Sequence, residues 1–430
     1  MRRRLPAKIF NRLREIGRLA DATGVSAYLV GGLVRDLLLG HTNLDVDIAV
    51  EGDGMAFARR LADRYGAGLK IFEKFATAYV VFPDGVKFDI ANTRAEQSAR
   101  PGTGWAEAWA LPSGGYCSIE QDLSHRDFTI NALAIRLDPA RFGQLIDLHS
   151  GVRDLKRRLI RARNKACFID DPARAFRAVR FEQRFRFRIE TATMVLLKDS
   201  VATGLVGTLP GHRVKNELFL LLAEKDPARA IRRLGELNLL PTIHPDLAFT
   251  PQLKTLLAHT VKALVWWARR FPKRLLDRPL IYFMALVDKL SGLTTDILMK
   301  RLVLPERQAV KVRTTKNRLV RVARGLFRYR LLKPSEIYRL LLDLPDEALA
   351  LLIAKAPSRD AKRIVTAYLM TYSGTRLAIN GKSLAAMGLH EGPIYKMILD
   401  SVLSAKLDGK ITTKREERDM ALRLVQKAAG

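Results

Sequence analysis

Two aspartates separated by one residue, Asp45 and Asp47, have the types and spacing that most clearly suggest chemistry in this sequence. They lie in the segment LDVDIAV, whose apolar residues predict a β-strand, and alternate residues of a strand point to the same face. Two neighbouring carboxylates repel each other unless a cation lies between them, and hard oxygen ligands suit Mg²⁺. The pair therefore predicts a metal site, and the alternative is a strand end with two solvated acids. The intervening Leu44, Val46 and Ile48 are expected to face a core.

A Gly-Gly pair, Gly31 and Gly32, ends the apolar segment that precedes these aspartates and predicts a tight turn from a strand into a short helix. Such a turn lets backbone N–H groups approach a phosphate closely. In a two-metal site one ion lowers the pKa of an attacking hydroxyl and the other stabilises the leaving group. The combination predicts nucleotidyl transfer, with one or two Mg²⁺ ions on the two aspartates and a triphosphate bound by Gly31, Gly32 and Arg35.

A third carboxylate, Asp89, lies in the segment KFDIA, which is predicted to be a strand after a Pro-Asp-Gly turn. A single strand is expected for residues 68–82 before that turn. Phe88 and Ile90 should face the core, which places Asp89 on the opposite face. Both interpretations of Asp89 stay open, a third metal ligand or a surface acid.

The segment FIDDPARAFRAVRF predicts a helix that starts at Asp171, since Asp at the N-cap followed by Pro favours helix initiation. Asp171 and Arg174 then face the same way, and Arg177 and Arg180 extend that face. A carboxylate accepts and a guanidinium donates a hydrogen bond. Cytosine and adenine offer an amine beside an unprotonated ring nitrogen, whereas guanine and uracil do not, so the pair predicts selection of C and A. A capped helix with a stabilising ion pair is the alternative.

These motifs, with the string HRDFTINALA, resemble the class II tRNA nucleotidyltransferase and poly(A) polymerase family, within the polymerase-beta-like nucleotidyltransferases. The likeness covers about residues 24–240. It implies that Arg126 and Asp127 contact the sugar and phosphates of the nucleotide and that Asn131 orients it. His125 departs from the family pattern, which has an arginine there.

The same resemblance implies that Asp171 and Arg174 read the base, and that Asp170 stands where the family usually has a glutamate. It also implies ATP and CTP as substrates and the 3′ end of tRNA as the acceptor. A loop over residues 95–118, with Trp105 and Trp109, is expected to help switch the site from CTP to ATP.

The charge balance points to a polyanionic partner. The 430 residues include 74 Lys and Arg against 44 Asp and Glu, a formal net charge of +30, and a surface this basic favours nucleic acid. No run of 18 apolar residues predicts a membrane helix. Two cysteines outside any CxxC pattern and the lack of a secretory signal predict a cytoplasmic protein with reduced thiols. The oligomeric state stays open.

Helical periodicity dominates the second half of the chain. Residues 311–330 contain eight basic residues and no acids, which favours phosphate contact over a merely soluble surface. The residues expected to bind RNA are Lys311, Arg313, Lys316, Arg318, Arg321 and Arg324.

The predicted fold class is α+β, a small mixed sheet with helices followed by an all-helical neck, body and tail. The expected domains are a catalytic head over 1–150, a base-reading neck over 151–240, an RNA-binding body over 241–330 and a tRNA-binding tail over 331–430. The expected function is addition of the terminal A, or of the whole CCA, to tRNA with release of pyrophosphate. A poly(A) polymerase is the alternative, and a non-catalytic RNA-binding protein is a remote one.

Overall fold

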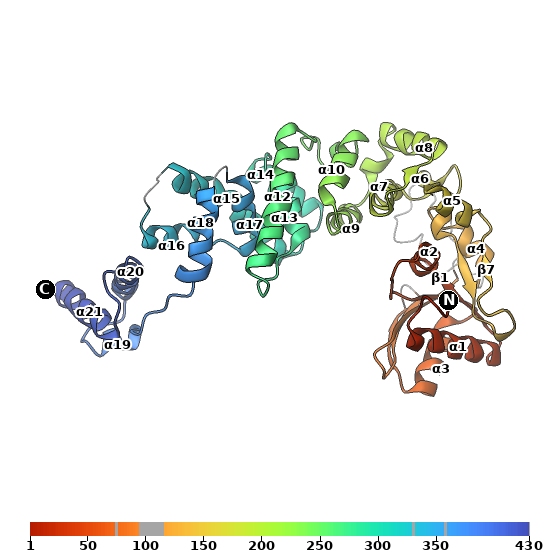
Figure 1. The fold of residues 1–430 in the computed structure, drawn as a ribbon, viewed down its shortest axis with the longest axis horizontal. Coiled ribbons are helices and arrows are strands. Elements are labelled where there is room, and N and C mark those ends of the chain that lie inside the picture. Colours follow the sequence, from red (N-terminus) through yellow and green to blue (C-terminus); the bar gives the residue numbers. More distant parts are fainter. Residues whose placement is uncertain (74–75, 94–115, 329–331, 357–358, 430) are drawn as a thin grey trace. The chain divides into compact units, whose positions relative to one another are not determined.

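The computed structural model describes residues 1–73, 76–93, 116–328, 332–356 and 359–429. These residues form two compact units (Figure 1), one comprising Met1–Leu209 with Leu237–Thr242 and the other Pro210–Glu236 with Ile243–Gly430. The predicted division into head, neck, body and tail stays a prediction. Trp105, Trp109 and most of the loop predicted for 95–118 lie outside the described residues.

A mixed sheet of seven strands, in the order β3-β4-β5-β2-β1-β6-β7, is the centre of the first unit. Strands β2 and β5 pair in parallel, and the other neighbours pair antiparallel. The predicted mixed sheet is thus confirmed. The strands are β1 (Ser26–Val30), β2 (Asp47–Glu51), β3 (Gly68–Phe72), β4 (Thr77–Val81), β5 (Lys87–Asn92), β6 (Ala134–Arg136) and β7 (Leu145–Ile146).

Two amphipathic helices cover this sheet (Figure 1). Helix α1 (Ala7–Ala22) buries Leu13 and Ile16, with other apolar residues at helical spacing, and packs on β1. Helix α3 (Gly54–Tyr65) is capped by the side chain of Asp53 and packs on β4 and β5. The two helices therefore support the strands that carry the candidate site.

The single strand expected for residues 68–82 is wrong, because β3 and β4 form an antiparallel hairpin there, in which Phe72 pairs with Thr77. The chain reverses between the two strands, where the Ala76 N–H donates to Glu73 O at 3.0 Å. The Pro-Asp-Gly turn before β5 is confirmed, since Phe82 N–H donates to Val86 O at 2.8 Å and Gly85 has a φ of +82°.

The first unit continues as helices around a short parallel ladder of β8 and β9. This part carries the predicted base-reading segment on α6 and α7. Its elements are α2 (Gly32–Leu39), α4 (Ile119–Ser124), η3 (Thr129–Asn131), η4 (Pro139–Arg141), α5 (Gly151–Arg157), β8 (Leu159–Ile160), α6 (Cys167–Asp170), α7 (Arg174–Phe185), β9 (Arg188–Ile189), α8 (Thr191–Ala202) and η5 (Leu205–Thr208).

The second unit contains helices and no strand in its described residues, as predicted. Trp267, Tyr282 and Phe283 are among its fully buried side chains. The helices are α9 (Gly211–Leu222), α10 (Pro227–Glu236), α11 (Leu240–Ile243, which begins in the first unit), α12 (Pro251–Arg270), α13 (Arg278–Leu286), α14 (Gly292–Arg301), α15 (Glu306–Arg328), α16 (Pro334–Leu341), α17 (Asp346–Lys355), α18 (Arg359–Ala367), η6 (Tyr368–Tyr372), α19 (Gly381–Ala385), α20 (Pro393–Leu407) and α21 (Lys414–Ala429).

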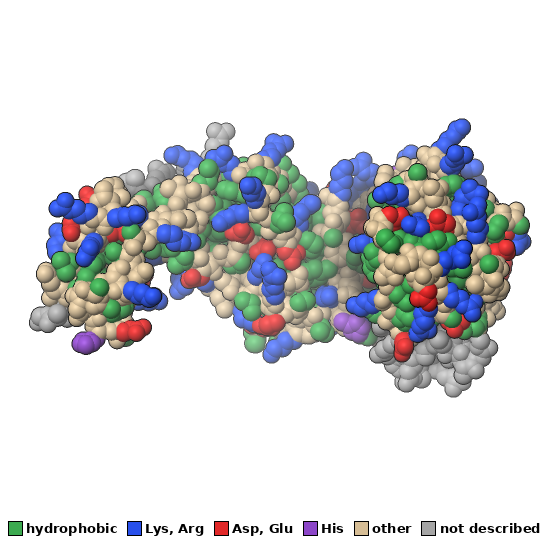
Figure 2. All heavy atoms as spheres, turned by 90° about the horizontal axis from the view of Figure 1, so that it is seen from below, with side chains coloured by type: hydrophobic (Ala, Val, Ile, Leu, Met, Phe, Trp, Pro, Cys, Tyr) green, Lys and Arg blue, Asp and Glu red, His purple; other side chains and the backbone are tan. Residues whose placement is uncertain are grey.

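The basic character of the sequence is visible on the surface. On the face drawn in Figure 2, Lys and Arg side chains outnumber Asp and Glu side chains. None of the described helices combines the length and the apolar character that crossing a bilayer requires.

Candidate active site

The Gly-Gly turn lies between β1 and α2 and faces the metal candidates. Gly31 has φ 72° and ψ −146°, a conformation open almost only to glycine. A Cβ atom added at Gly31 would lie 2.9 Å from Asp47 Oδ2. The turn and the carboxylate are therefore in contact, as one site for a triphosphate and a cation requires. The predicted C-terminal cap of α2 is also confirmed, with Gly40 in the left-handed region.

Replacing Gly31 by alanine is expected to lower nucleotide transfer about 100-fold or more, because the new Cβ strains the turn and displaces Asp47. The measurement is a single-turnover rate together with the melting temperature. Gly24 is a matched control, since it has the same φ of +72° but nothing within 4 Å of an added Cβ. Gly24→Ala should keep its transfer rate. A Gly31→Ala variant with more than half of the wild-type rate would contradict this assignment.

The three predicted carboxylates lie on or just before the neighbouring strands β2 and β5. Asp47 is the first residue of β2 and pairs with Asp89 of parallel strand β5. Burial, and then the carboxylates of Asp45 and Asp89, raise the pKa of Asp47 to about 6, against the opposing charge of Arg126. Burial and Asp45 likewise raise the pKa of Asp89. The three carboxylates therefore interact electrostatically. Among the described residues no group of three His, Cys, Asp or Glu side chains is arranged to hold a metal ion, so the metal site stays a prediction.

Asp45 lies outside the strand in which it was expected. Strand β2 begins only at Asp47, and the Asp45 N–H donates to Asn43 Oδ1 at 3.0 Å in a tight Asx turn. This turn interrupts the alternation, so Leu44 is 56% exposed instead of facing the core. The expectation for Leu44 is wrong, whereas Val46 and Ile48 are buried as expected.

The HRDFTINALA string forms a buried turn centred on Asp127. Its Oδ1 atom accepts hydrogen bonds from the Phe128 N–H at 2.8 Å and from Asn131 Nδ2 at 2.9 Å. Burial alone would raise the pKa of Asp127, but the Arg177 guanidinium and these hydrogen bonds outweigh it and lower that pKa. Arg126 pairs with Asp122 of α4 at 2.6 Å. Asp127 and Asn131 are therefore fixed before any nucleotide binds.

Helix α7 brings the predicted base-reading residues against this turn. Arg177 Nε and Nη2 both lie 2.8 Å from Asp127 Oδ2. Arg174 is buried and donates to the backbone oxygens of Cys167 at 3.3 Å and His125 at 3.0 Å. Arg174 and Arg177 thus attach α7 to the turn around His125 and Asp127.

The start of α7 differs slightly from the prediction. The helix begins at Arg174, while Asp171 lies in a tight turn before it and accepts a hydrogen bond from the Ala173 N–H at 3.0 Å. Arg174 Nε lies 4.0 Å from Asp171 Oδ2, and the Arg174 N–H donates to the Asp171 backbone oxygen at 3.1 Å. Asp170 ends α6 and is half-buried, and Arg180 is buried with its guanidinium 4.9 Å from the Phe181 ring.

The Arg35 side chain contacts other buried protein groups. It is buried, its Nη1 donates to Asn131 Oδ1 at 2.6 Å, and its guanidinium lies 4.5 Å from the Phe185 ring. The triphosphate role of Arg35 therefore stays a prediction. The sequence analysis missed the hydrogen-bonding partners Asp36, Asn43 and Asp122, and the only signal for Asp36 was its place directly after Arg35.

Comparisons with known proteins agree with this geometry. Residues 27–161 match the model of the poly A polymerase head domain, and residues 186–250 match the model described as probable RNA and SrmB- binding site of polymerase A. An A-adding tRNA nucleotidyltransferase of Halalkalibacterium halodurans is 31% identical over 95% of this chain and 91% of its own length. The chain belongs to the tRNA nucleotidyltransferase and poly(A) polymerase family.

Other members of this family align along the whole chain. The A-adding tRNA nucleotidyltransferase of Geobacter sulfurreducens is 38% identical over 100% of this chain, which spans only 48% of that relative. A solved CCA-adding enzyme in an apo form has a TM-score of 0.82 at 33% identity and covers 99% of this chain and 97% of its own. A Thermotoga maritima CCA-adding enzyme complexed with tRNA has a TM-score of 0.76 at 31% identity, over 99% of this chain and 97% of its own. The family fold thus extends through both compact units.

The basic segment on α15 has mostly intramolecular partners in this family member. Lys311 pairs with buried Glu347 at 2.6 Å, and Arg318 pairs with Asp343 at 2.7 Å. Arg313 lies 3.1 Å from Asp296, and Lys316 donates to the Asp288 backbone oxygen at 2.7 Å. Burial lowers the pKa of Lys316. Four of the six predicted RNA contacts therefore also hold the second unit together.

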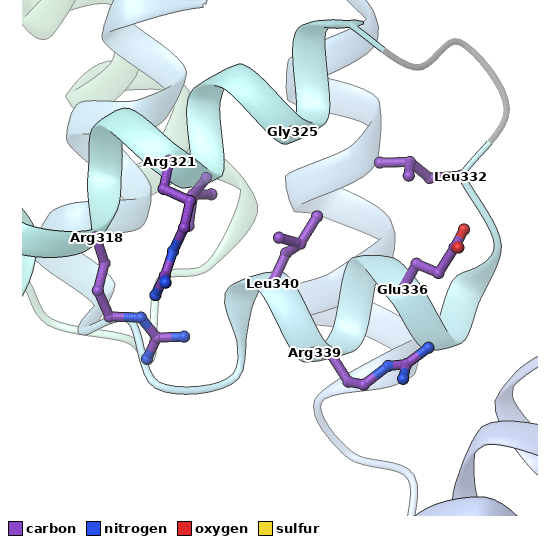
Figure 3. Close-up of a pocket in the computed structure, with 8 residues that line it drawn as sticks. Arg318, Arg321, Gly325, Leu332, Glu336, Arg339 and Leu340 are labelled. Carbon is purple, nitrogen blue, oxygen red and sulfur yellow. The ribbon is translucent and has the colours of Figure 1, made fainter.

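The remaining two arginines of that set, Arg321 and Arg324, are exposed. Arg318 and Arg321 of α15, together with Arg339 of α16, border a hollow of about 460 Å³ (Figure 3). The hollow is open to solvent and carries one acid among its lining residues, Glu336. Its charge suits a phosphate group.

Proposed function

We propose that this protein adds the terminal A to the 3′ end of tRNA, using ATP and releasing pyrophosphate. The observation that carries the proposal is the contact between the Gly31 turn and Asp47, beside Asp45 and Asp89, in a chain whose relatives with full or near-full alignment are named A-adding tRNA nucleotidyltransferases. Addition of the whole CCA is the second candidate, since solved CCA-adding enzymes with ATP and with CTP have TM-scores of 0.78 and 0.79.

The proposed reaction is attack by the 3′-hydroxyl of the RNA on the α-phosphorus of the nucleotide. Asp45 and Asp47, with Asp89 beside them, would hold Mg²⁺, whose charge would relieve the repulsion that raises the pKa of Asp47. When bound, the metal activates the hydroxyl and stabilises the leaving pyrophosphate. The backbone of Gly31 and Gly32 binds phosphate oxygens at the start of α2.

The nucleotide sugar and base are assigned to the other half of the site. Arg126, Asp127 and Asn131 position the ribose and the phosphates on the rigid turn after α4. Asp171 and Arg174 read the base edge, with the neighbouring residues of α6 and α7 supporting them. This assignment is supported by the Arg177–Asp127 pair, which fixes α7 on that turn.

RNA contact is proposed for the hollow between α15 and α16. Replacing both Arg321 and Arg339 by alanine is expected to weaken tRNA binding about tenfold. The slope of the logarithm of the binding constant against the logarithm of the salt concentration should become shallower by roughly 0.7–0.9 for each lost phosphate contact. The measurement is the tRNA dissociation constant at several salt concentrations. Neither side chain has an ion pair among the described residues, and Arg339 Nε donates at 3.4 Å to the Ser335 backbone oxygen of its own helix, so the melting temperature should change little.

Lys311→Ala is the contrasting variant for this experiment. It leaves Glu347, which is 3% exposed, without its ammonium partner and should lower the melting temperature. Unchanged tRNA affinity in the double arginine variant would exclude the hollow as an RNA contact.

Four RNAs test the proposed function directly: a tRNA lacking CCA, the same tRNA ending in C, the same ending in CC, and an unstructured RNA. Each is incubated with ATP, with CTP and with both, and products are resolved to one nucleotide. One A added only to the CC-ended tRNA supports the proposal. Completion of all three tRNAs indicates CCA addition, and long A tails on the unstructured RNA indicate a poly(A) polymerase.

A further inference from the structure

A series of hydrogen-bonded side chains, some buried and some half-buried, connects α7 to the loop that carries Asp45. Arg177 binds Asp127, which accepts from Asn131 Nδ2 at 2.9 Å, and Asn131 Oδ1 accepts from Arg35 Nη1 at 2.6 Å. Arg35 Nε in turn lies 2.9 Å from Asp36 Oδ1. Every member so far lies on a helix or a rigid turn.

The last two bonds of this series reach the metal candidate. Asn43 Nδ2 donates to Asp36 Oδ2 at 2.8 Å, and Asn43 Oδ1 accepts from the Asp45 N–H at 3.0 Å. Asp36 is 2% and Arg35 is 4% exposed, whereas Asp45 is exposed. Asp45 precedes β2, and the first bond to the neighbouring strand is made one residue later, where the Asp89 N–H donates to Val46 O at 3.0 Å. The Asn43 side chain connects the Asp45 N–H itself to the buried carboxylate of Asp36.

Gly32 leaves room for this arrangement. A Cβ atom added there would lie 3.2 Å from Arg35 Nη2 and 3.7 Å from Asn43 Nδ2. Gly32, the second glycine of the turn, thus leaves space for the Arg35 and Asn43 side chains, while Gly31 leaves space for Asp47. The two glycines of one motif serve two different neighbours.

We propose that Asn43 is a positioning residue that orients the Asp45 carboxylate for its divalent cation, held in place by Asp36 and Arg35. The inference rests on the proposed metal site but concerns a residue that touches neither substrate nor ion. A side chain that orients a metal ligand typically contributes about 10-fold or more to metal affinity. The effect arises because the freed loop samples orientations in which Asp45 misses the cation.

The test measures Mn²⁺ affinity by electron paramagnetic resonance on the full chain without RNA or nucleotide, together with melting temperatures and the Mg²⁺ dependence of transfer. Asn43→Ala should weaken Mn²⁺ binding about tenfold and raise the Mg²⁺ concentration for half-maximal rate. The neighbouring Thr42 is exposed and provides the control, since Thr42→Ala should bind Mn²⁺ as wild type does.

A swapped pair, Asp36→Asn with Asn43→Asp, separates hydrogen bonding from folding. The carboxylate introduced at position 43 can still accept from the Asp45 N–H. The amide introduced at position 36 can donate to that carboxylate and accept from Arg35, so Mn²⁺ affinity should return to within about twofold of wild type. Failure of the swap to restore affinity, or unchanged affinity in Asn43→Ala, overturns the inference. Lack of Mn²⁺ binding by the wild-type protein would instead overturn the metal site of the proposed function.

Discussion

Replacing Asp47 by asparagine is expected to reduce nucleotide transfer about 1,000-fold or more and to stabilise the metal-free protein. The amide removes a negative ligand from the proposed metal site, which accounts for the loss of activity. It also removes a carboxylate whose pKa is raised to about 6 by burial, Asp45 and Asp89. The measurements are single-turnover transfer and thermal unfolding in EDTA, with tRNA binding as the third readout, which should stay near wild type.

The sign of the stability effect follows from that pKa. Below the ordinary pKa of 3.8, Asp47 is neutral in both the folded and the unfolded state. The stability that the folded protein gains by holding this proton more tightly is then fully present. As the pH rises through about 6, the folded protein must ionise Asp47 among other acids, and that contribution is lost. At pH 7.5 the Asp47→Asn protein should therefore be more stable than wild type by on the order of 2 kcal/mol, reduced by the partial exposure of the side chain. At pH 4 the difference should largely disappear.

The control for this prediction is Asp63→Asn, which changes an exposed acid on α3. It should alter neither the transfer rate nor the stability difference between pH 4 and pH 7.5. Transfer by the Asp47 variant at more than a tenth of the wild-type rate would contradict the metal assignment. A lower melting temperature at pH 7.5 in EDTA would contradict the electrostatic account.

Changing Asp171 or Arg174, the proposed base-reading pair, is expected to lower the preference for ATP over GTP or UTP by roughly 10- to 100-fold. Asp171→Asn tests this role most directly. A carboxylate can only accept a hydrogen bond and leaves a carbonyl of guanine or uracil unpaired, whereas an amide can also donate a hydrogen bond to that carbonyl. The melting temperature should change little, since asparagine can still accept from the Ala173 N–H. The measurement is the kcat/KM of each of the four nucleotides with one acceptor tRNA.

Arg174→Ala should relax the same choice and also lower the melting temperature, since it leaves the backbone oxygens of Cys167 and His125 without this donor. Arg184, an exposed arginine on the same helix, is the control, and Arg184→Ala should retain selectivity. Wild-type discrimination against GTP and UTP in both Asp171→Asn and Arg174→Ala would remove the proposed base-reading role.

Local sequence patterns predicted the parts of the site that depend on one strand or one turn. The Gly-Gly turn, the Asp47 strand and the capped turn at Asp127 each follow from side chains within a few residues. The strand expected to include Leu44 failed for a local reason, because Asn43 competes for the Asp45 N–H and ends the alternation.

Partners distant in sequence explain what the sequence could not predict. Lys311 and Glu347 are 36 residues apart, and Arg35 and Asn131 are 96 residues apart. A run of cations without acids therefore indicated a free basic surface on α15, although the acids that pair with it lie on other elements. Likewise, the place of Arg35 beside a turn predicted to bind phosphate indicated a triphosphate ligand, although its buried partner Asn131 lies far away in the sequence.

The division of the chain between its two units limits how this protein can exchange parts with its relatives. The peptide leaves the first unit after Leu209, returns for Leu237–Thr242 and leaves again, so three junctions separate the units. Leu237, Leu239 and Leu240 of the returning segment are buried. In a recombinant hybrid with one breakpoint at residue 209, residues 237–242 would come from a different parent than the rest of the first unit. A fragment that ends at residue 209 would lack these residues altogether. Grafting a foreign catalytic half onto this helical half is therefore expected to succeed only when residues 237–242 come from the same parent as the sheet.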